Sequence, residues 1–165
     1  MQKVFWPLGA LLLTACAEPQ FTFRGYTELS DCRSVLDAEL EGGAKFQEAA
    51  DEETLLGEGV VTQLTGNLFT VPVRIFVSCY RNGAVSSVDY IAESTVPDES
   101  AAWFEHVARE LDAIFGGQPR QINTEDSRSR VYHCGDPVSV VLREARHGDM
   151  DFETSLAVTP GSASC

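Results

Sequence analysis

The 165-residue sequence carries none of the short motifs by which common enzyme families are recognised. It has no GxSxG nucleophile elbow, no HExxH zinc motif, no phosphate-binding glycine loop and no dinucleotide fingerprint. It also has no CxxC pair and no CxxxH cluster, the spacings typical of structural zinc sites. These absences predict a protein that is not an enzyme and needs no cofactor.

Basic residues are scarce. The chain has 12 Lys and Arg against 25 Asp and Glu, which gives a formal net charge of −13 at pH 7. Such a surface should repel nucleic acid and anionic lipid headgroups, so neither is an expected partner. Because the acids are spread along the chain, we interpret them as a solvated, soluble surface. The alternative is a negative face for a basic partner or for cations.

The sequence also lacks an apolar run long enough to cross a membrane. The longest one, from Val4 to Leu13, has ten residues, whereas a membrane-spanning helix needs roughly 20. It follows Lys3 and precedes Thr14-Ala15-Cys16, so a charged start, an apolar stretch and small residues lead to a cysteine. This order is typical of a secretory signal with a lipobox, and it resembles the signal segment of bacterial lipoproteins.

The resemblance implies that residues 1–15 are removed and that Cys16 becomes the triacylated, palmitate-bearing first residue. Several acyl chains hold a protein firmly on a membrane, where one chain gives only marginal binding. Ala17, where inner-membrane lipoproteins of well-studied Gram-negative species carry Asp, favours the outer membrane, facing the periplasm. Residues 16–25 are then the lipidated cysteine and its tether.

Four cysteines remain once the acylated one is set aside: Cys32, Cys79, Cys134 and Cys165. An even number in an exported protein predicts two disulfides, because the periplasm is oxidising. Three pairings are possible, and the sequence alone does not choose among them.

Two amphipathic helices are predicted. The first is capped by Ser30 or Asp31, runs to about residue 40 and ends at Gly42-Gly43. The second begins near Asp98 and ends at Gly116-Gly117. Its apolar face is predicted to hold Trp103, Phe104, Val107, Leu111, Ile114 and Phe115, with Glu105 and Arg109 paired on the other side.

Alternating segments predict an antiparallel sheet, so the fold class is α+β. Two tight turns are expected, at Thr65-Gly66-Asn67 and at Arg81-Asn82-Gly83, because asparagine and glycine accept positive φ. The predicted strands are 45–50, 59–65, 68–80, 84–91, 120–123, 130–134, 138–143 and 152–158.

The two halves of the chain share a pattern. Residues 40–43 end in Gly-Gly and are followed by Gln47, and residues 114–117 end in Gly-Gly and are followed by Gln121. We therefore predict two helix-plus-antiparallel-sheet units, 26–95 and 96–165, formed by tandem duplication and packed as one compact domain. Bridges within the units would be Cys32–Cys79 and Cys134–Cys165. The element order resembles that of the tandem helix–sheet β-lactamase inhibitory proteins, which implies a binding function.

Two hairpin tips carry candidate residues. Tyr80, Arg81 and Asn82 are candidates for binding another envelope protein, as is the tip at 147–150. His147, Asp149 and Asp151 could hold a divalent cation, although the same residue types suit a polar turn, which is the preferred interpretation.

Three functions follow, in order of preference. The first is a non-enzymatic binding or scaffolding lipoprotein, attached to the membrane through its lipid and bound to an envelope protein. The second is an inhibitor of a periplasmic or secreted enzyme, which would need a concave sheet surface with exposed aromatic residues. The third is a metal-dependent hydrolase.

Overall fold

Two helices and nine strands occupy the residues that the computed structural model describes: 31–47, 54–56, 59–116, 118–133, 138–148 and 151–160. The predictions for residues 1–30, Cys134, Asp149 and Cys165 lie outside these ranges. In chain order the elements are α1 Cys32–Glu41, β1 Lys45–Phe46, β2 Thr54–Leu56, β3 Gly59–Leu68, β4 Val71–Tyr80, β5 Val85–Ser94, α2 Pro97–Phe115, β6 Arg120–Asn123, β7 Ser127–His133, β8 Val138–His147 and β9 Asp151–Pro160.

Helix α1 begins and ends where local side chains dictate. Of the two candidate caps, Asp31 is the N-cap: its Oδ2 accepts hydrogen bonds from the Ser34 amide at 3.0 Å and the Ser34 hydroxyl at 2.7 Å. After the helix, Gly43 adopts φ +93°, which a residue with a side chain rarely does. The predicted bounds of this helix are therefore confirmed.

Helix α2 also follows its local signals. Pro97 occupies its first turn, and Gly116 ends it in the left-handed conformation at φ 62°. The prediction for Ile114 is wrong, because this side chain is exposed: at 3.6 residues per turn it lies at the margin of the buried stripe. Within the described residues, neither helix combines the length and apolar character that crossing a membrane requires.

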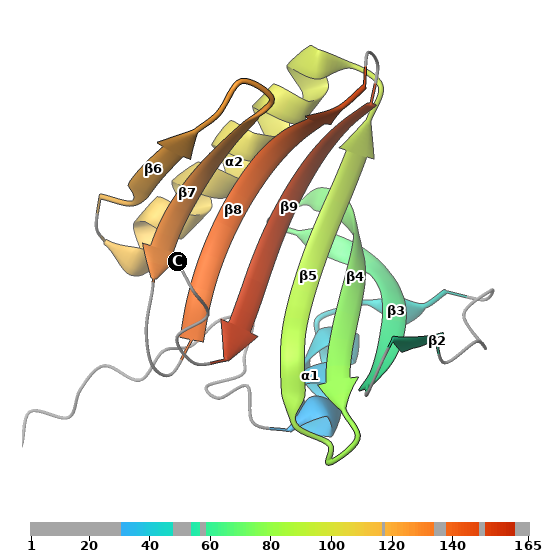
Figure 1. Cartoon of the computed structure of the whole chain (residues 1–165). Coiled ribbons are helices and arrows are strands. Elements are labelled where there is room, and N and C mark those ends of the chain that lie inside the picture. The colour runs from blue at the N-terminus through green and yellow to red at the C-terminus, as the bar shows by residue number, and fades with distance from the viewer. Residues whose placement is uncertain are drawn as a thin grey trace, which may run out of the picture.

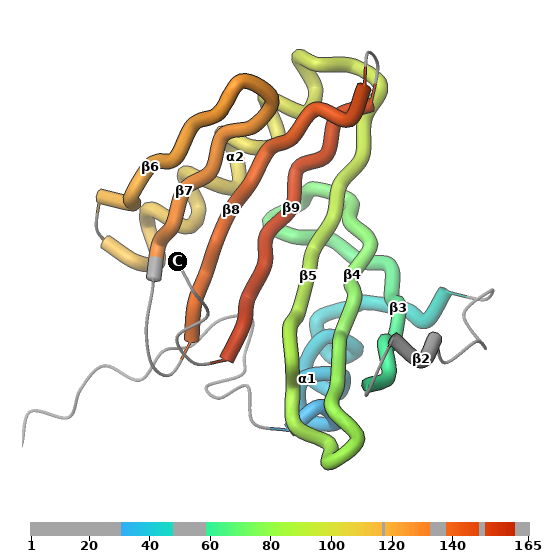
Figure 2. Tube along the Cα trace, in the orientation of Figure 1, coloured from blue at the N-terminus to red at the C-terminus, as the bar shows by residue number. Residues whose placement is uncertain are grey.

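All strands join one antiparallel sheet. Eight follow the order β1-β3-β4-β5-β9-β8-β7-β6, and β2 pairs with β3 beside β1. Each half of the chain thus supplies a helix followed by a meander of strands, and the two meanders meet through β5 and β9, which run side by side in Figure 2. The two predicted units share a single sheet in one domain.

The predicted turn at Thr65-Gly66-Asn67 is wrong, because these residues continue β3. The chain reverses at Phe69-Thr70, with φ 47° and 76°. Gly66 serves a different purpose: a Cβ there would lie 3.0 Å from Ile75 Cδ1 and 3.3 Å from Ala44 Cβ. Glycine in this strand permits a close approach of neighbouring chain segments.

Both helices cover the same face of the sheet and lie behind it in Figure 1. From α1, the fully buried Glu39 accepts a hydrogen bond from the Tyr90 hydroxyl at 2.5 Å. From α2, the Ser100 hydroxyl lies 3.1 Å from the Thr154 hydroxyl. Tyr90 and Thr154 point to the same side of the sheet. Tyr90 is paired with Leu156 on β9, and Leu156 and Thr154 share a side because they are two positions apart on that strand. The other side of the sheet carries no helix among the described residues, and we call it the open face.

The core lies between the helices and the sheet. It includes Val35 and Leu111 from the helices and Leu64, Ile75, Val77, Val88, Tyr90, Val140, Leu142, Leu156 and Val158 from the strands. The predicted Glu105–Arg109 pair is not formed. Glu105 instead binds Arg128 at 2.7 Å and Arg130 at 2.9 Å, so that α2 is tied to β7.

Candidate binding surface

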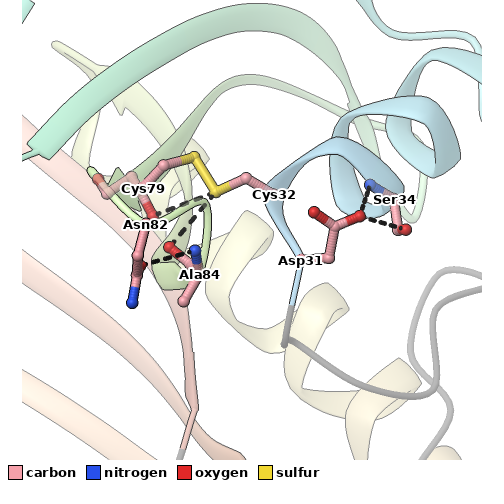
Figure 3. The surroundings of a disulfide bond; sticks show 7 residues. Asp31, Cys32, Ser34, Cys79, Asn82 and Ala84 are labelled. Atoms are coloured by element: carbon pink, nitrogen blue, oxygen red, sulfur yellow. Dashed lines mark hydrogen bonds between the residues drawn. A yellow bond between two sulfur atoms is a disulfide. The ribbon is translucent and has the colours of Figure 1, made fainter.

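The β4–β5 hairpin has the turn that its sequence predicts. Gly83 adopts φ +84°, and the Tyr80 amide donates to the Ala84 carbonyl oxygen at 2.8 Å. Asn82 Oδ1 accepts from the Ala84 amide at 3.1 Å, so this side chain stabilises the turn (Figure 3). Of the three candidates at this tip, Tyr80 and Arg81 are the exposed side chains left to meet a partner, and Tyr80 is 53% exposed.

The same hairpin holds the start of α1. The predicted disulfide Cys32–Cys79 is confirmed, and it links the first residue of α1 to β4 (Figure 3). Next to it, the Cys32 amide donates to the Gly83 carbonyl oxygen at 3.0 Å. The tip is therefore a structural junction as well as a candidate contact.

The second predicted tip, between β8 and β9, lies at the opposite end of the sheet (Figure 1). His147 and Asp151 face each other across the hairpin, and His147 Nε2 is 3.8 Å from Glu153 Oε2. Within the described residues, no three His, Cys, Asp or Glu side chains are arranged to hold a metal ion. Asp149 lies outside those residues, so the metal prediction for His147, Asp149 and Asp151 remains a prediction.

A hollow of about 770 Å³ adjoins this second tip. The Ser94 hydroxyl donates to Glu99 at 2.6 Å, and Arg74 binds Glu93. Carboxylates from three separate elements therefore meet at this end of the sheet. The hollow is lined by Glu93, Ser94, Thr95, Glu99, His147, Asp151, Phe152 and Glu153.

The open face carries a continuous row of side chains across the strands. The strand register places Phe76 on β4, Asp89 on β5, Ala157 on β9, Val141 on β8 and Val131 on β7 side by side in this row. Four of these five residues are apolar. A solvated face of an antiparallel sheet is ordinarily polar, so this row is unusual for a surface that only meets water.

The remaining member of that row, Asp89, is an acid. Asp89 lies between Phe76 and Ala157, and its Oδ2 accepts a hydrogen bond from the Ser87 hydroxyl at 2.7 Å. Burial among its neighbours raises the pKa of this carboxyl, and Glu153 raises it further, while the Ser87 hydroxyl acts in the opposite direction. The ionised carboxylate is thus held where water solvates it poorly.

We expect Asp89→Asn to raise the thermal midpoint at about pH 7. An acid whose folded pKa is raised binds its proton more tightly in the folded state, so stability falls as pH rises through the window between the two pKa values. Asparagine removes the free-energy cost of a poorly solvated carboxylate, and its amide oxygen can still accept the hydrogen bond from the Ser87 hydroxyl. Scanning calorimetry at about pH 7 and about pH 3 measures the effect, and the difference should vanish at the lower pH, where the carboxyl is protonated in both states.

The matched control is Asp126→Asn, on the exposed turn between β6 and β7. Its midpoint should stay close to that of the wild type at both pH values, as for most surface substitutions. An Asp89→Asn protein less stable than the wild type at about pH 7 would contradict the expectation.

Of these surface residues, sequence reasoning named those of the two tips and none of those on the open face. Glu93, Glu99 and Glu153 carry no local motif, and only the pairing of β5 with β9 and the position of α2 bring them together. Comparison of the chain with protein-family models, curated proteins and solved structures found no match. The class that fold and surface define is an α+β domain in which both described helices cover the same face of one antiparallel sheet.

Proposed function

We propose that this protein is a lipid-anchored, non-enzymatic binding module of the bacterial envelope that holds another envelope protein on its open face. The observation that carries the proposal is the row of apolar side chains on that face. Phe76, Val141 and Ala157 are each only partly buried there. Covering such a row with a partner removes apolar surface from water, which is the main favourable term in protein association.

The anchor in this proposal is Cys16 in the outer membrane, with the domain in the periplasm. Fourteen residues lie between Cys16 and Asp31, the first described residue, so the chain from one to the other reaches at most about 50 Å. A domain on such a tether could meet partners near the membrane surface.

We also propose that the two halves arose by duplication, as their Gly-Gly patterns suggest. In support, each half is a helix followed by a meander, and the order β1-β3-β4-β5 is mirrored in β6-β7-β8-β9 about the β5–β9 pair. A binding surface that spans the β5–β9 pair would contain residues from both halves of the chain.

Site-specific photo-crosslinking in intact cells tests the binding surface. A photoreactive residue is placed at Ser155 on the open face, at Tyr80 on the β4–β5 tip, or at Ala113 on the exposed side of α2. We expect a discrete crosslinked product from Ser155 and none from the control at Ala113. Ala157→Arg should abolish the product, because a long charged side chain would occupy the apolar row.

Other outcomes of this experiment separate the alternatives. A product from Tyr80 alone would move the interface to the hairpin tip and overturn the proposal for the open face. A product containing an enzyme whose activity falls on binding would favour the inhibitor, while confirming the surface.

A further inference from the structure

Asn82 is the one asparagine of the sequence that precedes a glycine. The others, Asn67 and Asn123, precede Leu68 and Thr124. In an Asn-Gly pair the glycine nitrogen can attack the asparagine side-chain amide, because glycine has no Cβ to shield its backbone. Asn82 and the glycine after it are exposed at the tip of the β4–β5 hairpin. Sequence and exposure therefore point to this asparagine as the one most open to that reaction.

The folded turn opposes the reaction at both reacting groups. The Gly83 amide, whose nitrogen would attack, donates its hydrogen to the Tyr80 carbonyl oxygen at 2.9 Å. The Asn82 side chain is also fixed, because its Oδ1 accepts a hydrogen bond from the Ala84 amide at 3.1 Å (Figure 3). An attack on Cγ requires the nitrogen to lose that hydrogen and the side chain to turn toward it. The turn must therefore open before the two groups can react.

The disulfide joins the start of α1 to this turn. Cys79 precedes Tyr80, and its partner Cys32 donates its amide hydrogen to the Gly83 carbonyl oxygen at 3.0 Å. Cys32 Sγ also lies 3.7 Å from the Ala84 carbonyl oxygen (Figure 3). That oxygen in turn accepts a hydrogen bond from the Tyr80 amide at 2.8 Å. Reduction of the bridge would remove the covalent link that keeps these contacts together.

We propose that Asn82 is a modification site whose conversion to isoaspartate is controlled by the Cys32–Cys79 disulfide. The Gly83 nitrogen attacks Asn82 Cγ, the Cγ–Nδ2 bond breaks, and ammonia leaves with the proton of the Gly83 amide. The product is a succinimide ring, which water then opens. Attack of water at Cγ gives aspartate, and attack at the former main-chain carbonyl carbon gives isoaspartate. The overall reaction thus consumes water and releases ammonia.

The two products have different effects on the tip. Aspartate keeps an oxygen where Asn82 has Oδ1, so the hydrogen bond from the Ala84 amide persists. Isoaspartate routes the backbone through Cβ and Cγ, which lengthens the turn. The lengthened turn shifts Gly83 relative to both Tyr80 and Cys32, so the tip holds the start of α1 less firmly. The conversion would therefore mark, irreversibly, those molecules whose disulfide has been open.

The test incubates the intact protein in mildly alkaline buffer, with the disulfide either oxidised or reduced. Peptide mass spectrometry measures the replacement of the Asn82 amide by a carboxyl group, and enzymatic methylation of isoaspartate distinguishes the two products. A synthetic peptide of residues 78–86 with Cys79→Ser gives the rate without the fold. We expect the oxidised protein to react at least about tenfold more slowly than the peptide, because the turn must first open locally. Reduction should bring the rate close to that of the peptide, while Asn123 in the same samples stays unmodified.

Hydrogen exchange of the Gly83 amide gives an independent measure of the same opening. Exchange also requires the hydrogen bond to Tyr80 to break, so reduction should accelerate exchange and deamidation by the same factor. A rate in the oxidised protein equal to that of the peptide, or a rate that reduction leaves unchanged, would overturn the proposal.

Asn82→Asp is the matched variant for the effect of the products on stability. It has no amide to lose and keeps the acceptor for Ala84, so its thermal midpoint should stay close to that of the wild type, as for most surface substitutions. The fraction of wild-type protein that contains isoaspartate should unfold at a lower temperature. Equal midpoints for this fraction and Asn82→Asp would overturn the expected loosening of α1.

Discussion

Replacing Cys16 with serine is expected to release the protein from the membrane almost completely. Acylation needs the cysteine thiol, and each buried methylene group of an acyl chain contributes about 0.8 kcal/mol to membrane binding. Without acyl chains, a domain with a net charge near −13 has no attraction to anionic headgroups. Metabolic labelling with palmitate and fractionation of the cells would show loss of the label and transfer to the soluble fraction.

Ala17→Asp is the companion variant. It leaves the thiol intact, so the label should remain while the protein moves from the outer to the inner membrane in a species that uses the aspartate sorting rule. Palmitate on the Cys16→Ser protein, or its full retention in washed membranes, would contradict the lipoprotein assignment.

Removing the Cys32–Cys79 disulfide is expected to lower the free energy of unfolding by about 4 kcal/mol. The bridge joins residues 47 apart, and closing a loop of that length reduces the entropy of the unfolded chain by this order in the chain-entropy description. A domain of this size is ordinarily stable by about 5–15 kcal/mol, so the loss is severe. Urea unfolding of Cys32→Ser/Cys79→Ser against the oxidised wild type measures it.

Two comparisons make this experiment specific. The double variant Cys134→Ser/Cys165→Ser reports separately on the second predicted bridge. Reduced wild type should match the protein in which all four cysteines are replaced. A loss below about 1 kcal/mol in Cys32→Ser/Cys79→Ser would mean that packing and the buried Glu39–Tyr90 hydrogen bond suffice to hold α1.

Helix limits were predictable because their causes are local. The Asp31 side chain reaches Ser34 three residues away, and Gly43 and Gly116 need only their own backbone freedom. The hairpin turn ending at Gly83 belongs to the same group. Each signal acts within a few residues, so it can be interpreted without knowing the fold.

Gly66 and Glu39 show where local interpretation fails. Gly66 indicates a turn by its type, yet it is required inside a strand by Ala44 and Ile75, which only the register brings close. Glutamate on a helix is ordinarily exposed, yet Glu39 is fully buried and accepts a hydrogen bond from Tyr90, 51 residues away. The environment of both residues is set by contacts with residues that are distant in the sequence.

The sequence by itself determined the limits of both helices, the α+β class and the surplus of negative charge. Those features depend on periodicity, capping and composition, which neighbouring residues decide. The tertiary structure alone decided that β5 and β9 join the halves into one sheet and that both helices cover one face. It thereby placed Glu93 opposite Glu153 on the open face, because strand pairing between distant segments sets which side chains meet.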